Sequence, residues 1–275
     1  MGFAKETIGD TYLYTVPAFS RTRLVEHGFT CRLGGLSKKE FSSFNVAFHV
    51  GDNPDIVIKN RKKMVRLLNE DLESLVASEQ IHGHEVYVVG IKDRGRGSIS
   101  YDSAIPQTDA LITNVPGIIL SLYFADCVPV FFLDPVHQVI ALAHAGWKGT
   151  VQHIVSLTIK KMTELFGTDP ELCLAAIGPS IGRCCFQVDR PVVDEFARYV
   201  DGYEEFCFPH GAEKWLLDLP GINRHLLIKE GFRLENITKS DFCTFCSNDL
   251  FFSYRKDGGR TGRQAALIML KERSI

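Results

Sequence analysis

Residues 108–150, TDALITNVPGIILSLYFADCVPVFFLDPVHQVIALAHAGWKGT, decide the fold class of this chain. Four apolar runs rich in β-branched residues follow one another in this stretch and are separated by turns. They lie at 110–113, 117–124, 128–133 and 138–144. Runs of this length and composition predict β-strands. Their near-continuous hydrophobicity predicts strands that are buried on both faces.

Further elements are predicted on both sides of this stretch. Residues 53–69, with Pro54 near the start, and residues 150–166, with an apolar stripe opposite charged residues, show helical periodicity. Two more helices are predicted at 192–199 and after Asp218, and three more strands at 85–90, 172–177 and 264–270. Since strands and helices alternate irregularly, we expect an α/β (α+β) fold. It would be a single domain over residues 1–275, with a mixed β-sheet core and flanking helices.

The composition excludes several classes of protein. The chain has 275 residues, of which 45% are hydrophobic, so a sizeable core can form. Its formal net charge of −2 provides no global attraction to nucleic acid or to an anionic membrane. The longest apolar stretch, 115–133, contains Asp126 and Pro129, which makes it a poor membrane span. We therefore expect neither a nucleic acid nor a membrane as a partner.

The first residues of the chain do not resemble a secretory signal, because Lys5, Glu6 and Asp10 stand where its apolar segment would lie. A cytoplasmic location is therefore expected, where thiols stay reduced. The eight cysteines are then core residues, metal ligands or nucleophiles rather than members of a disulfide framework.

Cys127 and His144 are the first candidates for chemistry. Asp126 and Cys127 lie where one predicted strand ends and the next begins, and His144 lies at the end of another, before a glycine-rich turn. Functional groups of α/β proteins usually lie at such strand ends. A cysteine in an apolar run and a histidine at a strand end are also common as core and hydrogen-bonding residues, so this alternative stays open.

The segment QIHGH, residues 80–84, supplies a further candidate ligand. One cysteine and two histidines form a three-ligand zinc site whose fourth position is open for water, as in catalytic zinc sites. Such an ion lowers the pKa of its bound water towards about 7. The ligands would come from distant segments, so no spacing rule supports this set. His84 could replace His82, since both precede the same predicted strand.

Two loops contain paired cysteines. Residues 177–188, IGPSIGRCCFQV, run from a strand into glycine and proline, and backbone amides freed there could hold an anion or a sugar. A tight turn with two packed thiols explains the same residues equally well. Cys243 and Cys246 form a single CxxC pair, which can at most join ligands from elsewhere, so a structural role is favoured.

Four basic residues, Arg255, Lys256, Arg260 and Arg263, lie within nine residues of each other. A solvated loop is the default interpretation, but arginines beside serine and glycine also suit a phosphate, through forked donors and close backbone approach. Asn45 interrupts an apolar segment near the N-terminus. An asparagine at such a position is typical of a turn. A polar residue in a buried setting also needs hydrogen-bonding partners, and a bound ligand is one possible partner.

Seven segments carry a resemblance to known proteins. They are SFNVAFHVGD (43–52), QIHGHEV (80–86), TDALIT (108–113), ADCVPV (125–130), ALAHAGWKGT (141–150), IGPSIGRCCFQVD (177–189) and FFSYRKDGGRTGRQAALI (251–268). In this order they resemble the YfiH/YlmD-type family, whose members are named laccase-domain proteins, polyphenol oxidases and, more recently, purine nucleoside phosphorylases. The resemblance covers roughly residues 42–268 and implies a YfiH-like fold, in a group first described as cysteine hydrolases.

The resemblance also implies a metal and a chemistry. Zn²⁺ would be held by His82, Cys127 and His144, and Cu²⁺ is an alternative, because copper-dependent oxidation of phenols is the family's older assignment. The implied partners are phosphate and the purine nucleosides adenosine, inosine and 5′-methylthioadenosine, which are cleaved to the free base and a ribose 1-phosphate. Adenosine deamination is also ascribed to the family.

Individual roles follow from this resemblance and from the residue types. The catalytic candidates are Asp126, Cys127 and His144, and Asp126 is placed to carry a proton during deamination. The candidates for binding substrate or phosphate are Asn45, Lys148, Arg255 and Arg263. The pair Phe186-Gln187 departs from the Tyr-Glu of many relatives, and Gln187 would be only a weak proton acceptor.

Three other classes of function stay open. Cys127 could act as a nucleophile with His144 as its base, giving a thiol-dependent hydrolase or amidase. A metal bound by the same two groups would prevent that chemistry. A polyphenol oxidase is less favoured, because multicopper sites use repeated His-x-His pairs and the chain has one, His82-Gly83-His84. A non-catalytic sensor of metal or nucleoside is the third class.

Overall fold

The computed structural model describes residues 2–272, and two six-stranded sheets form its centre. The first sheet contains, in order, β1 (Ala4–Ile8), β2 (Thr11–Thr15), β3 (Val25–Thr30), β15 (Gln264–Leu270), β7 (Ile119–Phe124) and β4 (Leu75–Ala77). The second contains β14 (Ile237–Lys239), β10 (Leu174–Ile177), β8 (Val128–Asp134), β9 (Val139–Ala145), β6 (Ala110–Thr113) and β5 (Val86–Val88). Both sheets combine parallel and antiparallel pairs, which confirms the predicted mixed β-sheet core.

The chain passes from the first sheet to the second between β7 and β8. These strands are consecutive apolar runs in the sequence, but β7 pairs with β15, whereas β8 pairs with β9. Residues 125–127 make the passage, and Asp126 takes a left-handed backbone conformation there, with φ of 88°. The passage places Cys127 where the two sheets meet.

Apolar side chains fill the space between the two sheets. Phe29 and Phe124 from the first sheet and Phe131 and Leu142 from the second belong to one cluster of buried side chains. Full burial of a side chain of this size contributes roughly 1.5–3 kcal/mol to stability. This core holds the ends of β7, β8 and β9 in fixed positions, and the candidate site lies at those ends.

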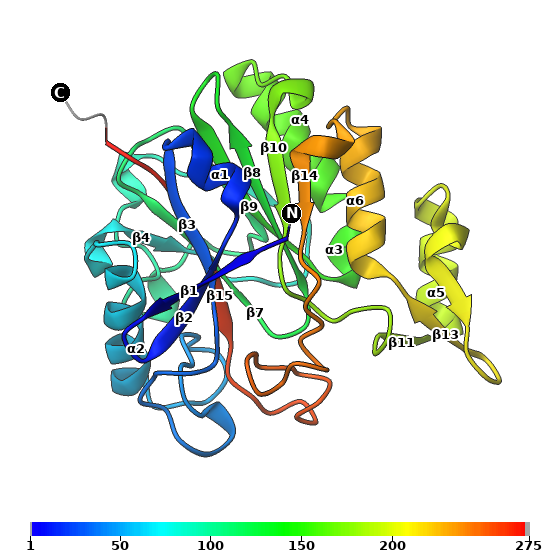
Figure 1. Ribbon diagram of the computed structural model, residues 1–275, viewed down its shortest axis with the longest axis horizontal. Helices are drawn as coiled ribbons and strands as arrows, with labels where there is room; N and C mark the ends of the chain where they lie inside the picture. Colours follow the sequence, from blue (N-terminus) through cyan, green and yellow to red (C-terminus); the bar gives the residue numbers. More distant parts are fainter. Residues whose placement is uncertain (1, 273–275) are drawn as a thin grey trace.

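Helices cover the outer face of each sheet (Figure 1). α2 (Pro54–Arg66) covers the first sheet and begins after Asn53, whose side chain accepts a hydrogen bond from the backbone N–H of Asp55 at 2.9 Å. α4 (Ile154–Phe166) and α6 (Leu219–Lys229) cover the second sheet. Among residues 2–272, no helix combines the length and the apolar character that crossing a membrane requires.

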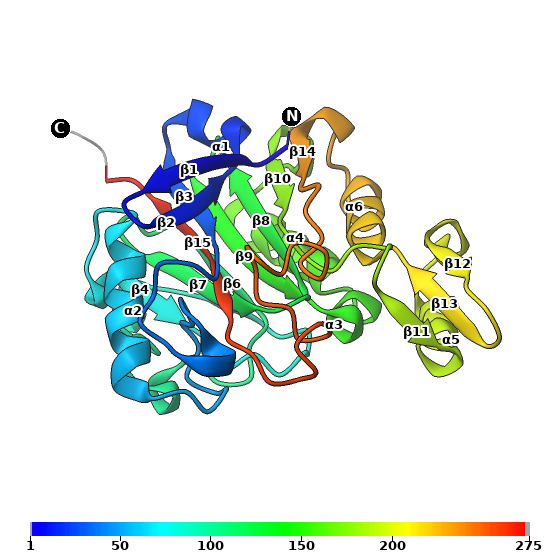
Figure 2. The ribbon, with the colours of Figure 1, turned by 60° about the horizontal axis from the view of Figure 1, so that its bottom comes forward.

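A small third sheet stands beside the two large ones. It contains β11 (Gln187–Asp189), β13 (Lys214–Leu217) and β12 (Cys207–Pro209), and α5 (Arg190–Tyr199) packs against it. Figure 2 shows this unit projecting at the right of the view, away from the main sheets. The remaining short helix, α1 (Pro17–Thr22), connects β2 to β3.

The structure corrects the sequence prediction at one helix and adds strands at the N-terminus. The helix predicted at 150–166 is two helices, α3 (Trp147–Val151) and α4, because His153 has a left-handed backbone (φ 60°) that interrupts the helical turn. The strands β1 to β3 carry charged and polar residues beside apolar ones, as at Lys5 and Glu6, and were not predicted. The four runs between 110 and 144 form β6 to β9 as predicted.

Candidate metal centre

A cavity of about 470 Å³ lies where the two sheets meet. Its walls come from the segment before β5, the ends of β7 and β9, the loop after β10 and the loop before β15. The lining residues are His49, Gln80, His82, Tyr123, Ala125, Asp126, Cys127, His144, Trp147, Ile181, Phe186, Tyr254, Arg255 and Arg263. Segments that are far apart in the sequence therefore contribute to one site.

Three of these residues form a compact group of metal-binding side chains. His82, Cys127 and His144 each present one ligand atom, and the three atoms lie within 4.8 Å of one another. The register of the β8–β9 pair explains part of this arrangement, because Val128 lies opposite Ala145 and the ends of the two strands coincide. The ring centroids of the two histidines are 4.9 Å apart.

Gly146 leaves room for this group. A Cβ atom at this position would lie 3.0 Å from the Sγ of Cys127 and 3.3 Å from the Cδ2 of His82. Both separations are shorter than an ordinary van der Waals contact, so any larger residue would displace the two ligands. The glycine of the AHAGW segment is therefore needed for the side chains to converge.

Asp109 lies behind the three ligands and was not predicted as a site residue. Its carboxylate is fully buried, and its Oδ1 is 2.7 Å from the Nδ1 of His144. An ionised carboxylate only accepts hydrogen bonds, so Nδ1 of His144 carries a proton, and Nε2 is left as the ring nitrogen that can bind a metal ion. The TDALIT segment places this acidic residue directly before a largely apolar strand, and this pattern was the signal that could have identified it.

The same carboxylate also fixes the loop that carries His82. The backbone N–H groups of Ile81 and Gly83 donate to Oδ2 of Asp109 at 3.1 and 2.7 Å, and that of His82 donates to Oδ1 at 3.1 Å. Gln80 adds two further bonds, because its side-chain amide pairs with the backbone N–H and C=O of Tyr123 at 2.8 and 2.9 Å. His82 is thus oriented through its backbone.

Burial and neighbouring charges shift the pKa values of Cys127 and His144 in opposite directions. Burial alone would raise the pKa of the Cys127 thiol, but the imidazole of His144, helped by that of His82, lowers this pKa to about 6. Burial would lower the pKa of His144, but Cys127 and Asp109 raise it to about 9. The thiolate form of cysteine, which is the form that binds metals, is therefore favoured at neutral pH.

The structure separates the two histidines that the sequence left as alternatives. His82 belongs to the group with Cys127 and His144, whereas the ring of His84 contacts the side-chain amide of Gln152. His84 and the exposed Lys148 line a different cavity, on the other side of Trp147. In the described part of the chain, Lys148 is thus not brought to the cavity that contains Cys127.

Asp126 lies in the cavity wall, and both of its carboxylate oxygens already accept hydrogen bonds. Oδ1 accepts from the hydroxyl of Thr244 at 2.6 Å, and Oδ2 accepts from the backbone N–H of Arg255 at 2.7 Å. Its backbone carbonyl accepts from the N–H of Ile181 at 2.9 Å. Asp126 therefore ties two loops of the cavity wall to the passage between the sheets.

Two of the predicted basic residues reach the cavity. Arg255 and Arg263 line it, while Asn45 is fully buried and accepts the backbone N–H of Arg263 at 2.9 Å. The Arg255 guanidinium lies over the ring of Phe186, with 5.5 Å between its Cζ and the ring centroid. Asn45 thus positions Arg263 through a hydrogen bond to the backbone of Arg263.

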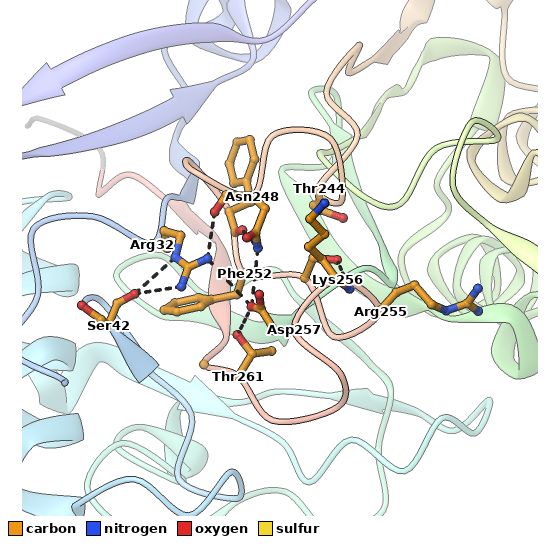
Figure 3. A network of polar contacts seen from close by, with 12 residues as sticks. Arg32, Ser42, Thr244, Asn248, Phe252, Arg255, Lys256, Asp257 and Thr261 are labelled. Carbon is orange, nitrogen blue, oxygen red and sulfur yellow. Dashed lines mark hydrogen bonds and ion pairs between the residues drawn. The ribbon is translucent and has the colours of Figure 1, made fainter. Parts of the chain in front are cut away.

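A polar network orders the loop that carries these arginines (Figure 3). Arg32 donates to the backbone carbonyls of Ser42, at 3.1 and 3.2 Å, and of Asn248, at 2.8 Å. Its Nη1 lies 3.8 Å from a carboxylate oxygen of Asp257, which also accepts from the hydroxyl of Thr261 at 2.6 Å. The loop is consequently anchored on both sides of the arginines.

Comparison with known proteins places this geometry in a family. Residues 26–271 match the family described as multi-copper polyphenol oxidoreductase laccase. The chain belongs to this family. Its description names copper, and a set of one thiolate and two imidazoles suits Cu²⁺ as well as Zn²⁺, so the choice of metal is part of the proposal below.

Individual relatives agree with this assignment. The purine nucleoside phosphorylase YlmD of Bacillus subtilis is 40% identical over 245 residues, 89% of this chain and 88% of that protein. The adenosine deaminase RL5 of an unknown prokaryotic organism is 32% identical over 264 residues, 96% of this chain and 95% of that protein. The crystal structure of the Bacillus licheniformis hypothetical protein YfiH has a TM-score of 0.93 and 37% identity and covers 98% of this chain and 99% of that one. The YfiH-like fold is thereby confirmed.

Replacing Asp109 by Asn should weaken metal binding about 10- to 100-fold, which is the usual effect of removing a carboxylate behind a histidine ligand. The amide keeps the size of the side chain but cannot hold the Nδ1 proton of His144 as an anion does. Competition with a chromophoric chelator measures the affinity, and Asp102→Asn, at an exposed position, is the matched control. Equal affinities in the two variants would contradict the role given to Asp109.

Alkylation of the metal-free protein should report the perturbed thiol. Since the pKa of Cys127 is about 6, its rate of reaction with iodoacetamide should rise with pH through about 6 and reach a plateau near neutrality. His144→Ala removes the positive charge and should move this midpoint upwards, towards the usual value of about 8.5. Peptide mass spectrometry resolves the sites, and Cys207, whose pKa burial raises, serves as an internal reference. A midpoint of Cys127 equal to that of Cys207 would exclude the thiolate.

Proposed function

We propose that this chain is a zinc-dependent purine nucleoside phosphorylase. Its substrates would be adenosine, inosine and 5′-methylthioadenosine, and its products the free base and a ribose 1-phosphate. The observation that carries the proposal is the convergence of His82, Cys127 and His144 on a cavity that two arginines also line. The relative named purine nucleoside phosphorylase, 40% identical over most of both chains, supports the same reading.

The residues around the three ligands fit a metal ion. Their ligand atoms lie within 4.8 Å of one another, Gly146 leaves the space between them free of a Cβ, and Asp109 presents the Nε2 of His144. Three protein ligands leave one position open, as in catalytic zinc sites. When bound, Zn²⁺ would supply a Lewis acid next to the bound substrate.

Phosphorolysis requires an anion site beside an apolar site for the base. Phosphate attacks C1′ of the ribose, the bond from C1′ to the purine nitrogen breaks, and the purine leaves with the electron pair and takes up a proton. Arg255 and Arg263 are the groups that we assign to phosphate, since each guanidinium offers forked donors to phosphate oxygens. Lys148 is left out of this site because it lines a different cavity.

Aromatic side chains provide the apolar part of the cavity. Trp147, Phe186 and Tyr254 line it, and the guanidinium groups of Arg255 and Arg263 lie over the rings of Phe186 and Tyr254. A purine ring buries a large flat surface, and aromatic faces are suited to it. We assign Asp126 to positioning rather than to proton transfer, because both of its oxygens hold wall residues.

Two other activities follow from specific observations. The relative named adenosine deaminase supports deamination as a side activity of the same cavity. Asp109 contacts His144, and His144 contacts Cys127. Cysteine hydrolases use the same series of an orienting acidic residue, a histidine base and a cysteine nucleophile, so a thiol hydrolase is the second candidate. Metal binding and nucleophilic attack need the same sulfur, so only one of the two applies at a time.

Product analysis distinguishes these activities. Protein of known zinc content should convert adenosine to adenine and ribose 1-phosphate only when phosphate is present, and the products are separated chromatographically. Inosine formed without phosphate would indicate deamination instead. Neither product, together with rapid alkylation of Cys127 in the protein as purified, would overturn the proposal in favour of a thiol hydrolase. Cys127→Ala and His144→Ala should each lose the zinc ion of this site and the activity while the circular dichroism spectrum persists.

Arg255→Ala should raise the KM for phosphate by about 10-fold or more, because a hydrogen bond to a charged group is worth about 1.5–3 kcal/mol. Its backbone bond to Asp126 does not involve the side chain and should persist. Arg260→Ala is the matched control, since Arg260 pairs with Glu40 at 2.7 Å and does not line the cavity. Equal values of KM for phosphate in the two variants would remove Arg255 from the phosphate site.

A further inference from the structure

Four cysteines converge outside the cavity. The sulfur atoms of Cys184, Cys185, Cys243 and Cys246 all lie within 4.8 Å of one another. Two of them come from the loop after β10 and two from the CxxC pair, about sixty residues further along the chain. None of them belongs to the group of His82, Cys127 and His144.

Backbone contacts bring the two loops together at this point. Ser180 and Cys243 form an isolated parallel bridge, and the N–H of Thr244 donates to the carbonyl of Ser180 at 3.0 Å. The N–H of Gly182 donates to the sulfur of Cys243 at 3.2 Å. A Cβ on Gly182 would lie 3.3 Å from the Cβ of Cys243, which is tighter than an ordinary contact. The arrangement is thus built by the backbone, and the glycine lets the two loops approach each other closely.

Two of the separations between the sulfur atoms are close to those of tetrahedral coordination. Zn–S bonds of about 2.3 Å in a tetrahedron place the sulfur atoms about 3.8 Å apart. The sulfur of Cys246 lies 3.7 Å from that of Cys184 and 3.4 Å from that of Cys185. A disulfide would need about 2.05 Å.

Exposure distinguishes three of the four residues from core cysteines. Cys184 and Cys246 are exposed and Cys185 is partly exposed, whereas Cys243, like Cys31 and Cys173, is buried. A cysteine that only fills a core is normally buried. Exposed thiols gathered around a common centre are instead accessible to an ion from solution.

We propose that Cys184, Cys185, Cys243 and Cys246 form a second metal site, which binds Zn²⁺ through four thiolates. Four protein ligands leave no open position, so this site is structural rather than catalytic. The ammonium of Lys256 lies over the ring of Phe245, a residue between the two cysteines of the CxxC pair, 4.5 Å from its centroid. The N–H of Gly182 supports the sulfur of Cys243 as hydrogen bonds to metal thiolates commonly do.

The site joins two walls of the cavity. The loop with Cys184 and Cys185 also carries Ile181 and Phe186, and the loop with the CxxC pair continues to Arg255; all three of these residues line the cavity. A bound ion would cross-link the two loops beside their common contact, Asp126, whose backbone carbonyl binds one loop and whose carboxylate binds the other. This proposal does not depend on the reaction that the cavity performs.

Metal analysis of the full-length protein tests the proposal. The protein is saturated with Zn²⁺ and freed of excess ion by gel filtration, and its zinc is measured by mass spectrometry. We expect two zinc ions per chain in the wild type, one in Cys243→Ser/Cys246→Ser, one in Cys127→Ala/His144→Ala, and two in the control Cys207→Ser. Retention of both ions by the first variant would overturn the proposal.

Two further readouts do not depend on the folding of Cys243→Ser/Cys246→Ser. In the zinc-loaded wild type, the four cysteines should resist alkylation and react after treatment with a chelator, as peptide mass spectrometry reports. Cys127→Ala/His144→Ala loaded with Co²⁺ should show thiolate-to-cobalt charge-transfer bands and the visible bands of tetrahedral Co²⁺. Free alkylation of the four in the zinc-loaded protein, or a disulfide among them in protein prepared under reductant, would contradict the proposal.

Discussion

The buried carboxylate of Asp109 is the interaction on which the candidate metal centre depends. One oxygen holds the ring of His144 in the orientation that presents Nε2, and both oxygens hold the backbone of the segment that carries His82. A buried carboxylate without partners would be strongly destabilising, so these four hydrogen bonds are needed for its own burial as well. Two ligands from distant segments are thus fixed by one side chain.

The fold itself positions Cys127, which Asp109 does not contact, and brings His144 beside it. The passage of the chain from the first sheet to the second puts Cys127 at the junction, and the β8–β9 pair brings His144 beside it. Gly146 then keeps the space between the ligands free of a Cβ. Asp126 uses the same junction to anchor the two loops that close the cavity. Ligands, walls and anchors therefore all lie at the place where the two sheets meet.

The sequence predicted the strands better than their pairing. The runs of β6 to β9 are continuous and apolar, so their positions were clear, but the division into two sheets is set by contacts between distant segments such as β15 and β7. The choice between His82 and His84 shows the same limit. Both precede β5, and the hydrogen bonds that residues 80–83 make with Asp109 and Tyr123 orient the ring of His82 towards Cys127. The sequence predicted no metal site at the CxxC pair, because a single pair needs ligands from elsewhere. Cys184 and Cys185 are distant along the chain, and only the fold brings them beside it.

Diffraction from crystals of the purified protein at wavelengths on either side of the zinc absorption edge tests the central claim most directly. The account predicts an anomalous difference peak in contact with the Sγ of Cys127 and the Nε2 of His144, with His82 as the third ligand. The peak should vanish on the long-wavelength side of the edge. Crystals grown with zinc that show no peak between these three side chains, or a peak bound by His84 instead, would contradict it.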